Sequence, residues 1–202
     1  MITTIIFDLG GVLIDWNPQY LYKKILSNEA EMKNFLEKVC TSDWNEEQDG
    51  GRTIKEATET LIAEFPEHEQ NIRVYYERWD EMLNGVIEGT ADILKKLKES
   101  KKYKLYALTN WSAETYPIAQ QKYEVLQWFD GVVVSGTEKI RKPFPEFYQL
   151  LLSRFNVNAE EALFIDDNLR NVKAAKQIGI DSIQFTTPEK LNDELKEKGI
   201  TF

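Results

Sequence analysis

Short β-branched, apolar segments alternate with helical patterns along most of this chain, and this alternation constrains its fold more than any other feature. Strands are predicted at residues 2–7, 104–108, 131–134, 162–165 and 182–185. Helices are predicted between them at 91–99, capped by Thr90, at 145–155, and at 169–178, which ends at Gly179. Strands that alternate with helices form right-handed βαβ units, so the sequence predicts an α/β fold with a parallel sheet.

The stretch from residue 16 to residue 86 lacks this alternation. It shows no strand pattern, and helices are predicted at 18–26, 29–39, 53–65 and 71–83. Roughly 70 residues are too many for a connection between a strand and its helix. We therefore expect a core formed by residues 1–15 and 87–202, with a helical cap formed by residues 16–86. A charged helix at 190–198 is expected to present a solvated face.

The composition excludes several classes of protein. The chain has 25 Lys and Arg against 34 Asp and Glu, a net charge of −9, which argues against nucleic acid or an anionic membrane surface as partner. No apolar run approaches the roughly 20 residues that span a bilayer. The single cysteine, Cys40, cannot form an internal disulfide, so a reducing, cytoplasmic location is expected. His68 is the only histidine, which excludes a multi-histidine metal site. For His68 itself, a surface position is the favoured interpretation.

Carboxylates stand directly after two of the predicted strands. Asp8 follows the first, and the glycines after it allow close approach of the backbone to a ligand. There it could bind a cation or attack an electrophile, and a structural turn residue is the alternative. Asp166 and Asp167 follow the strand at 162–165, where adjacent like charges repel unless a cation lies between them. Mg²⁺ would relieve that repulsion, whereas helix capping by Asp167 would explain one carboxylate more easily than two.

Two further segments could bind an anion. Thr109 and Asn110 end the strand at 104–108, where a hydroxyl and free backbone N–H groups could hold a phosphate, and Ser112 could cap the next helix. Lys142 lies in a basic loop stiffened by prolines and is a suitable point charge for phosphate, with a surface basic pair as the alternative. Because ligands bind at the carboxyl ends of parallel strands, these groups could converge with the carboxylates on one crevice.

Together these residues form four motifs that resemble those of the haloacid dehalogenase superfamily. In chain order the motifs are Phe7-Asp8-Leu9-Gly10-Gly11-Val12-Leu13-Ile14-Asp15, Leu108-Thr109-Asn110, Arg141-Lys142-Pro143 and Phe164-Ile165-Asp166-Asp167-Asn168. The resemblance spans the whole chain and looks closest to bacterial sugar-phosphate phosphatases and the phosphatase domain of soluble epoxide hydrolases. It implies a Rossmann-like core with a small helical cap.

The resemblance also implies a nucleophile and a metal site. Asp8 would attack phosphorus and form an aspartyl-phosphate, which water would then hydrolyse. Mg²⁺ would be held by Asp8, the backbone carbonyl of Gly10 and Asp167, with Asp166 either a ligand or a supporting residue.

Substrate binding follows from the same resemblance. Thr109 and the backbone of Asn110 would hold phosphoryl oxygens, and Lys142 would balance charge as the transition state develops. The implied substrate is a small phosphorylated metabolite, such as a sugar phosphate.

The chain departs from the family pattern at Gly10. Phosphatases of the family usually carry an Asp at this position, two residues after the nucleophile, where it protonates the leaving oxygen and later activates water. Loss of a general acid typically costs about 10²–10⁴ in rate. Asp15 is near in sequence, and nothing in the sequence indicates that it reaches the site. Arg52 or another cap residue could assist.

Gly10 therefore leaves a second hypothesis open: a non-catalytic or weakly active member that binds phosphorylated ligands or a partner. If the chain is active, the loss would favour good leaving groups such as acyl, anomeric sugar or aryl phosphates. A carbon–halogen hydrolase also lacks the second Asp, but such enzymes use no metal and the acidic pair looks like a metal site. A phosphomutase is disfavoured because it needs an acid/base residue at position 10.

Substrate selectivity is expected to come from the cap. Trp44, Asp49, Arg52 and Trp79 are the candidate residues there, with core packing as the alternative for the tryptophans. Nothing in the sequence indicates an oligomeric state.

Overall fold

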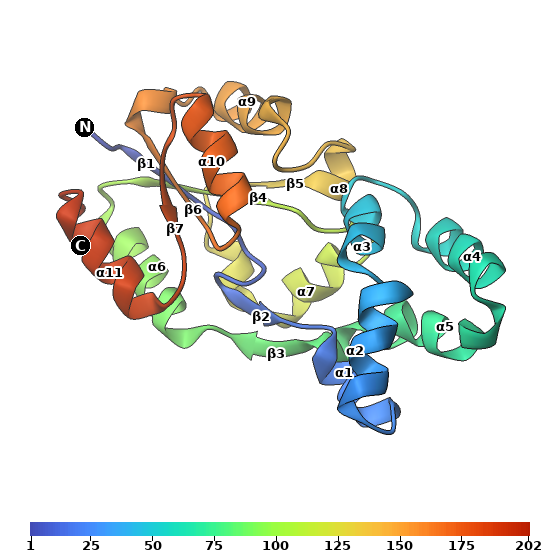
Figure 1. The fold of residues 1–202 in the computed structure, drawn as a ribbon. Helices are drawn as coiled ribbons and strands as arrows, with labels where there is room; N and C mark the ends of the chain where they lie inside the picture. Colours follow the sequence, from blue (N-terminus) through green and yellow to red (C-terminus); the bar gives the residue numbers. More distant parts are fainter.

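A five-stranded parallel sheet forms the centre of the molecule in a computed structural model that describes all 202 residues (Figure 1). The strand order is β5-β4-β1-β6-β7. In chain order the strands are β1 (Thr4–Phe7), β4 (Lys104–Thr109), β5 (Gly131–Val134), β6 (Ala162–Asp166) and β7 (Asp181–Gln184). All four neighbouring pairs are parallel. The predicted parallel α/β fold is therefore confirmed.

Helices cover both faces of this sheet (Figure 1). On one face lie α6 (Glu88–Ser100) and α11 (Pro188–Glu197), and on the other α9 (Pro145–Phe155) and α10 (Leu169–Gln177). The central strand β1 is buried on both faces because Ile5 and Phe7 belong to one hydrophobic cluster and Ile6 to another. Such burial explains why the strand is a continuous apolar run rather than an alternating one.

The connections between these elements contain further short helices. They contain α7 (Tyr116–Lys122) and α8 (Ser135–Glu138), together with 3₁₀ turns at Glu124–Gln127 and Ala159–Glu161. None of the helices is long and apolar enough to cross a membrane.

Residues 17–82, which we call the helical region, lie between two short strands, β2 (Ile14–Trp16) and β3 (Leu83–Val86). The region contains α1 (Gln19–Ile25), α2 (Glu29–Lys38), α3 (Ser42–Asp49), α4 (Ile54–Glu64) and α5 (Glu69–Glu77). Two 3₁₀ turns, at Pro66–His68 and Trp79–Met82, follow α4 and α5. Figure 1 shows the region beside one end of the sheet, beyond α7 and α8.

The expectation of no strand between residues 16 and 86 is wrong. Strands β2 and β3 pair antiparallel, with Trp16 opposite Leu83, and form a ribbon through which the chain enters and leaves the helical region. Both strands are too short to show a period of two, and Gly85, at φ 117°, interrupts the second.

Three helix predictions also need correction. Helix α3 is absent from the sequence prediction because its segment, Ser-Asp-Trp-Asn-Glu-Glu-Gln-Asp, has almost no apolar stripe. Helix α6 begins at Glu88, so Thr90 is a buried residue inside it rather than its cap. The helix predicted at 71–83 ends at Glu77 and gives way to a 3₁₀ turn.

The C-terminal helix α11 is charged, as predicted, but it is not only a solvated face. Leu191 and Leu195 are buried in the same cluster as Leu94 and Leu97 of α6. The predicted boundary between residues 15 and 16 falls inside β2, and the division into core and cap stays a prediction at this point.

Candidate active site

Three polar segments meet at one edge of the sheet, where β1, β4 and β6 end side by side. Asp8 directly follows β1, Thr109 ends β4, and Asp166 ends β6. The register places Phe7 opposite both Ala107 and Ile165, so the three strand ends are level. The convergence expected from the sequence is therefore present in the structure.

Lys142 lies at the centre of this group. Its side chain is fully buried, and its Nζ lies 2.8 Å from Asp8 Oδ2 and 2.7 Å from Asp166 Oδ2. The Asn110 side chain fixes the lysine's backbone, because its Oδ1 accepts from the Lys142 N–H at 2.8 Å and its Nδ2 donates to the Lys142 carbonyl at 3.0 Å. A surface basic pair is thus excluded for Lys142. The Asn110 side chain has a positioning role that the sequence did not reveal.

Burial and charge act against each other in this cluster. Burial would lower the pKa of the Lys142 ammonium, but the carboxylates of Asp166 and Asp8 outweigh it and the pKa is raised. Burial raises the pKa of Asp8, and Lys142 opposes that shift while Asp166 and Asp167 add to it. The cluster therefore holds more negative charge than its single cation balances.

Asp8, Asp166 and Asp167 each place an oxygen within 4.8 Å of the other two. Asp166 is fully buried and saturated, since its oxygens bind Lys142 Nζ, Asn171 Nδ2 at 3.1 Å and the Asn168 N–H at 2.8 Å. Asp167 is exposed and makes no such set of bonds. Mg²⁺ in proteins is usually held by one or two carboxylates together with waters, and Asp8 and Asp167 can supply these. The residues present therefore fit a magnesium site.

The turn after Asp8 is shaped around the acidic pair. Gly11 has a φ of 75°, and a Cβ at this position would lie 2.5 Å from Asp167 Oδ2. The positive φ and this close approach to the Asp167 side chain both favour glycine, whereas the expected close approach of the backbone to a ligand stays a prediction. Helix capping by Asp167 is excluded, because the N-cap of α10 is Asn168.

Two hydroxyl groups follow β4. Thr109 is fully buried and its Oγ1 makes no hydrogen bond within the protein, so it can donate to a ligand oxygen. The sequence suggested that Ser112 caps α7, but it does not. Its Oγ accepts from the Glu114 N–H at 3.2 Å and closes a turn, and the N-cap of α7 is Thr115.

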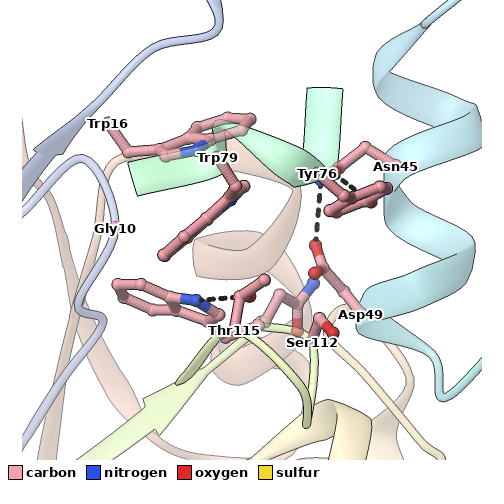
Figure 2. A pocket seen from close by; sticks show the side chains of 10 residues that line it. Gly10, Trp16, Asn45, Asp49, Tyr76, Trp79, Ser112 and Thr115 are labelled. Atoms are coloured by element: carbon pink, nitrogen blue, oxygen red, sulfur yellow. Dashed lines mark hydrogen bonds between the residues drawn. The ribbon is translucent and has the colours of Figure 1, made fainter. Parts of the chain in front are cut away.

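A pocket with a cavity volume of about 70 Å³ lies between this edge and the helical region (Figure 2). It combines indole rings with amide, hydroxyl and carboxyl groups. Its lining residues are Gly10, Trp16, Asn45, Asp49, Tyr76, Trp79, Asn110, Trp111, Ser112 and Thr115. Figure 2 shows Gly10 and Trp16 on one side and Asn45 and Asp49 of α3 on the other.

The sequence identified part of this lining. Asp49 and Trp79 line the pocket, whereas Trp44 and Arg52 do not. Arg52 instead donates from Nε to Gln48 Oε1 at 2.8 Å and from Nη2 to the Trp44 carbonyl at 3.0 Å, so it holds the end of α3.

Five other lining residues were missed: Trp16, Asn45, Tyr76, Trp111 and Thr115. Their only sequence signal is the aromatic, amide or hydroxyl character of their side chains, which packing explains equally well.

Ion pairs hold the helical region against the sheet edge. Glu46 of α3 lies 2.8 Å from Arg141 and 2.6 Å from Arg170. The Glu114 carboxylate also accepts from the backbone N–H of Ile54 at 2.7 Å. Asp15 stays outside the site, because its carboxylate accepts from the Tyr20 hydroxyl and from Asn84 Nδ2.

The sequence of this chain is similar to that of known proteins. A family model described as haloacid dehalogenase-like hydrolase matches residues 2–179. The chain belongs to this family. Membership makes it a hydrolase, and it confirms the resemblance on which the motif assignment rests.

Several members of the family are similar to it over most of their length. A sesquiterpene phosphatase of Aspergillus oryzae is 27% identical over 183 residues, which are 90% of this chain and 88% of that protein. A phosphorylated carbohydrates phosphatase of Thermotoga maritima is 30% identical over 196 residues, 94% of this chain and 87% of that one. A solved HAD-family enzyme of Bacteroides thetaiotaomicron, in complex with magnesium and inorganic phosphate, shares the fold with a TM-score of 0.71 and 23% identity over 93% of this chain and 95% of that one.

Proposed function

We propose that this hydrolase is a Mg²⁺-dependent phosphohydrolase that acts on a small phosphorylated metabolite through an aspartyl-phosphate on Asp8. The observation that carries the proposal is the buried contact of Lys142 with both Asp8 and Asp166. A purely structural crevice has no need of a buried cation beside three carboxylates, since such groups are costly to bury. The names of the two phosphatase relatives support the same reaction class.

The metal would be held by Asp8, the backbone carbonyl of Gly10 and Asp167. The oxygens of Asp166 already bind Lys142, Asn171 and the Asn168 N–H, which favours a supporting role for Asp166. When bound, Mg²⁺ supplies positive charge that neutralises the nucleophile and the phosphoryl group. A mutant of the similar Bacteroides enzyme has been solved with magnesium and inorganic phosphate, which supports a magnesium site in this fold but does not identify its ligands.

Each remaining residue of the edge has a definite part in the reaction. Asp8 attacks phosphorus, and the bond between phosphorus and the leaving oxygen breaks. The Thr109 hydroxyl and the Asn110 N–H donate to phosphoryl oxygens, and Lys142 balances the charge that develops on them. Water then hydrolyses the aspartyl-phosphate, which releases inorganic phosphate and regenerates Asp8.

Residues 16–86 serve as a cap over a core formed by residues 1–15 and 87–202. Asn45, Asp49, Tyr76 and Trp79 of the cap line the pocket opposite Gly10, and its small cavity of about 70 Å³ favours a compact metabolite over a macromolecule. Indole rings beside amide and hydroxyl groups suit a substrate with both apolar faces and hydroxyls, such as a sugar phosphate.

The second candidate is a member that binds phosphorylated ligands without turning them over, and Gly10 favours it. A carbon–halogen hydrolase is disfavoured because Asp8, Asp166 and Asp167 form a site suited to a metal.

The decisive assay measures release of phosphate from a sugar phosphate and an aryl phosphate, with and without Mg²⁺. We expect Mg²⁺-dependent turnover that is lost in Asp8→Asn, and binding of beryllofluoride that needs both Mg²⁺ and Asp8. No turnover of either ester at micromolar enzyme would favour the binding protein, and normal turnover by Asp8→Asn would refute the nucleophile.

A further inference from the structure

The pocket contains a carboxylate that the family pattern does not assign. Gly10 stands where the general acid is expected, and a Cβ built on it meets no atom within 4 Å, so this position opens into free space. Among the lining residues of the pocket there is one carboxyl group, that of Asp49. Figure 2 shows Asp49 above Ser112, across the pocket from Gly10.

We propose that Asp49, which the cap helix α3 contributes to the pocket, is the general acid and base that replaces the missing carboxylate at position 10. The proposal rests on the proposed phosphohydrolase function. If the proposal is right, Gly10 does not indicate lost activity, because the acid is supplied by the cap instead of the core.

Neighbouring side chains hold Asp49 in place. Asn45, one turn earlier in α3, donates from Nδ2 to Asp49 Oδ2 at 3.5 Å. The orientation of that amide is set from the other side, because the Tyr76 hydroxyl donates to Asn45 Oδ1 at 3.0 Å and itself accepts from Gln48 Nε2 at 2.9 Å. The Asp49 contact is long, so the carboxyl group stays available to a ligand.

The helix that carries Asp49 is also tied to the core. Glu46, on the same helix, contacts Arg141 next to Lys142 and Arg170 of α10. Asp49 therefore lines the same pocket as Gly10 and Asn110 from a fixed position rather than from a free loop.

The surroundings of Asp49 keep it partly protonated near neutral pH. Burial and the Glu46 carboxylate raise its pKa to about 7, against smaller opposing effects of Arg141, Lys142 and the Ser112 N–H. A pKa near the working pH is what acid–base catalysis requires. Tyr76, which packs beside it from α5, has its own pKa raised by burial and stays neutral.

The remaining carboxylates near the pocket are engaged elsewhere. Asp15 binds Tyr20 and Asn84, and Glu46 binds two arginines. Asp8 and the acidic pair belong to the nucleophile and metal site.

The proton balance follows directly. As Asp8 bonds to phosphorus and the leaving oxygen departs, the Asp49 carboxyl gives its proton to that oxygen and becomes a carboxylate. The carboxylate then takes a proton from the water that attacks the aspartyl-phosphate, so the products are an alcohol, inorganic phosphate and the original enzyme.

The test compares two esters that differ in their need for an acid. Phenyl phosphate has a poor leaving group, whereas 2,4-dinitrophenyl phosphate has one that departs without a proton. We expect Asp49→Asn to lower kcat/KM for phenyl phosphate about 10²–10³-fold and that for the dinitrophenyl ester less than about threefold. The parameter kcat/KM reports the steps up to departure of the leaving group. A slower hydrolysis of the aspartyl-phosphate therefore does not change it.

Two further variants test the assignment by rescue and by pH. Adding Gly10→Asp to the Asp49→Asn variant should raise its kcat/KM for phenyl phosphate at least about tenfold, because position 10 has room for a carboxylate. The fall of wild-type kcat/KM for phenyl phosphate as pH rises through about 7 should disappear in Asp49→Asn. Glu47→Gln, an exposed carboxylate of the same helix, is the matched control and should change neither ester.

An equal loss with both esters, or an unchanged pH profile, would overturn the role of Asp49 and leave the phosphohydrolase intact. A wild type that hydrolyses neither ester with Mg²⁺ would instead overturn the proposed function. Circular dichroism and thermal unfolding of each variant establish that the losses do not come from misfolding.

Discussion

The sheet edge beside the pocket, which we call the sheet side, and the helical wall of the pocket, which we call the helical side, differ in how their polar groups are satisfied. On the sheet side, Lys142, Asp8 and Asp166 are buried and bound to one another at 2.7–2.8 Å. On the helical side, Asn45 and Asp49 are only half-buried and joined by a contact of 3.5 Å. The sheet side is thus organised before any ligand arrives, whereas the helical side keeps groups free for one. This contrast is consistent with our proposals, in which the sheet side makes the bond to phosphorus and the helical side transfers the proton.

Lys142→Met should have the largest effect, because it disrupts the buried ionic cluster of the sheet side. It leaves three neighbouring carboxylates without their cation, so the free energy of unfolding should fall by about 3–5 kcal/mol and turnover should be lost. Denaturant unfolding measures the change, and Mg²⁺ should recover part of it. Lys122→Met removes an exposed lysine that lies 3.7 Å from Asp80, and should cost less than about 1 kcal/mol. Equal losses in the two variants would contradict the picture of the buried cluster.

The next test separates the two adjacent acids. Asp167→Asn should lower turnover about 10²–10³-fold at limiting Mg²⁺, with recovery at higher Mg²⁺ and little change in stability, because this residue is a metal ligand in our proposal. Asp166→Asn should mainly destabilise the protein, because it leaves Lys142 with one partner fewer. Magnesium titrations followed by activity and by unfolding distinguish the two. The reverse pattern would exchange their roles.

A smaller effect is expected where the helical region meets the core. Glu46→Gln removes the charge that pairs with Arg141 and Arg170, so the helical region should close less firmly and KM should rise about three- to tenfold. The free energy of unfolding should change by about 1 kcal/mol or less, since both pairs are partly exposed. Steady-state kinetics measure the effect, with Asp43→Asn, an exposed carboxylate of the same helix, as the control. A change in kcat alone would show that the contact does not govern closure.

The smallest effect compares helix caps on the two sides. Thr53 caps α4 in the helical region and Thr187 caps α11 in the core, each through its hydroxyl. Thr53→Ala and Thr187→Ala should each cost about 1 kcal/mol of stability. Neither residue lines the pocket, so kcat/KM should stay within twofold. A large kinetic change in Thr53→Ala alone would mean that fraying of α4 reaches the pocket.

The sheet side was largely predictable from the sequence, and the helical side was not. Asp8, Thr109 and Asp166 end strands of one parallel sheet, and strand ends of such a sheet must lie together, so chain order alone indicates their proximity. No comparable rule brings Trp16, Asn45 and Tyr76 to one pocket. They come from a ribbon and two helices whose relative placement depends on side-chain packing. Asp49 was a candidate for substrate selectivity. Helix α3, which places it in the pocket, was not predicted because its sequence is almost entirely polar.

The two-stranded ribbon of β2 and β3 has a consequence for how such a protein can be altered. Because Trp16 and Leu83 are paired neighbours, the helical region leaves and rejoins the sheet-bearing part at a single point. Segments whose ends lie close together can be exchanged without rerouting the rest of the chain. The ribbon is therefore a natural grafting site: a different insert joined at residues 16 and 83 would place a different pocket wall beside the same sheet edge.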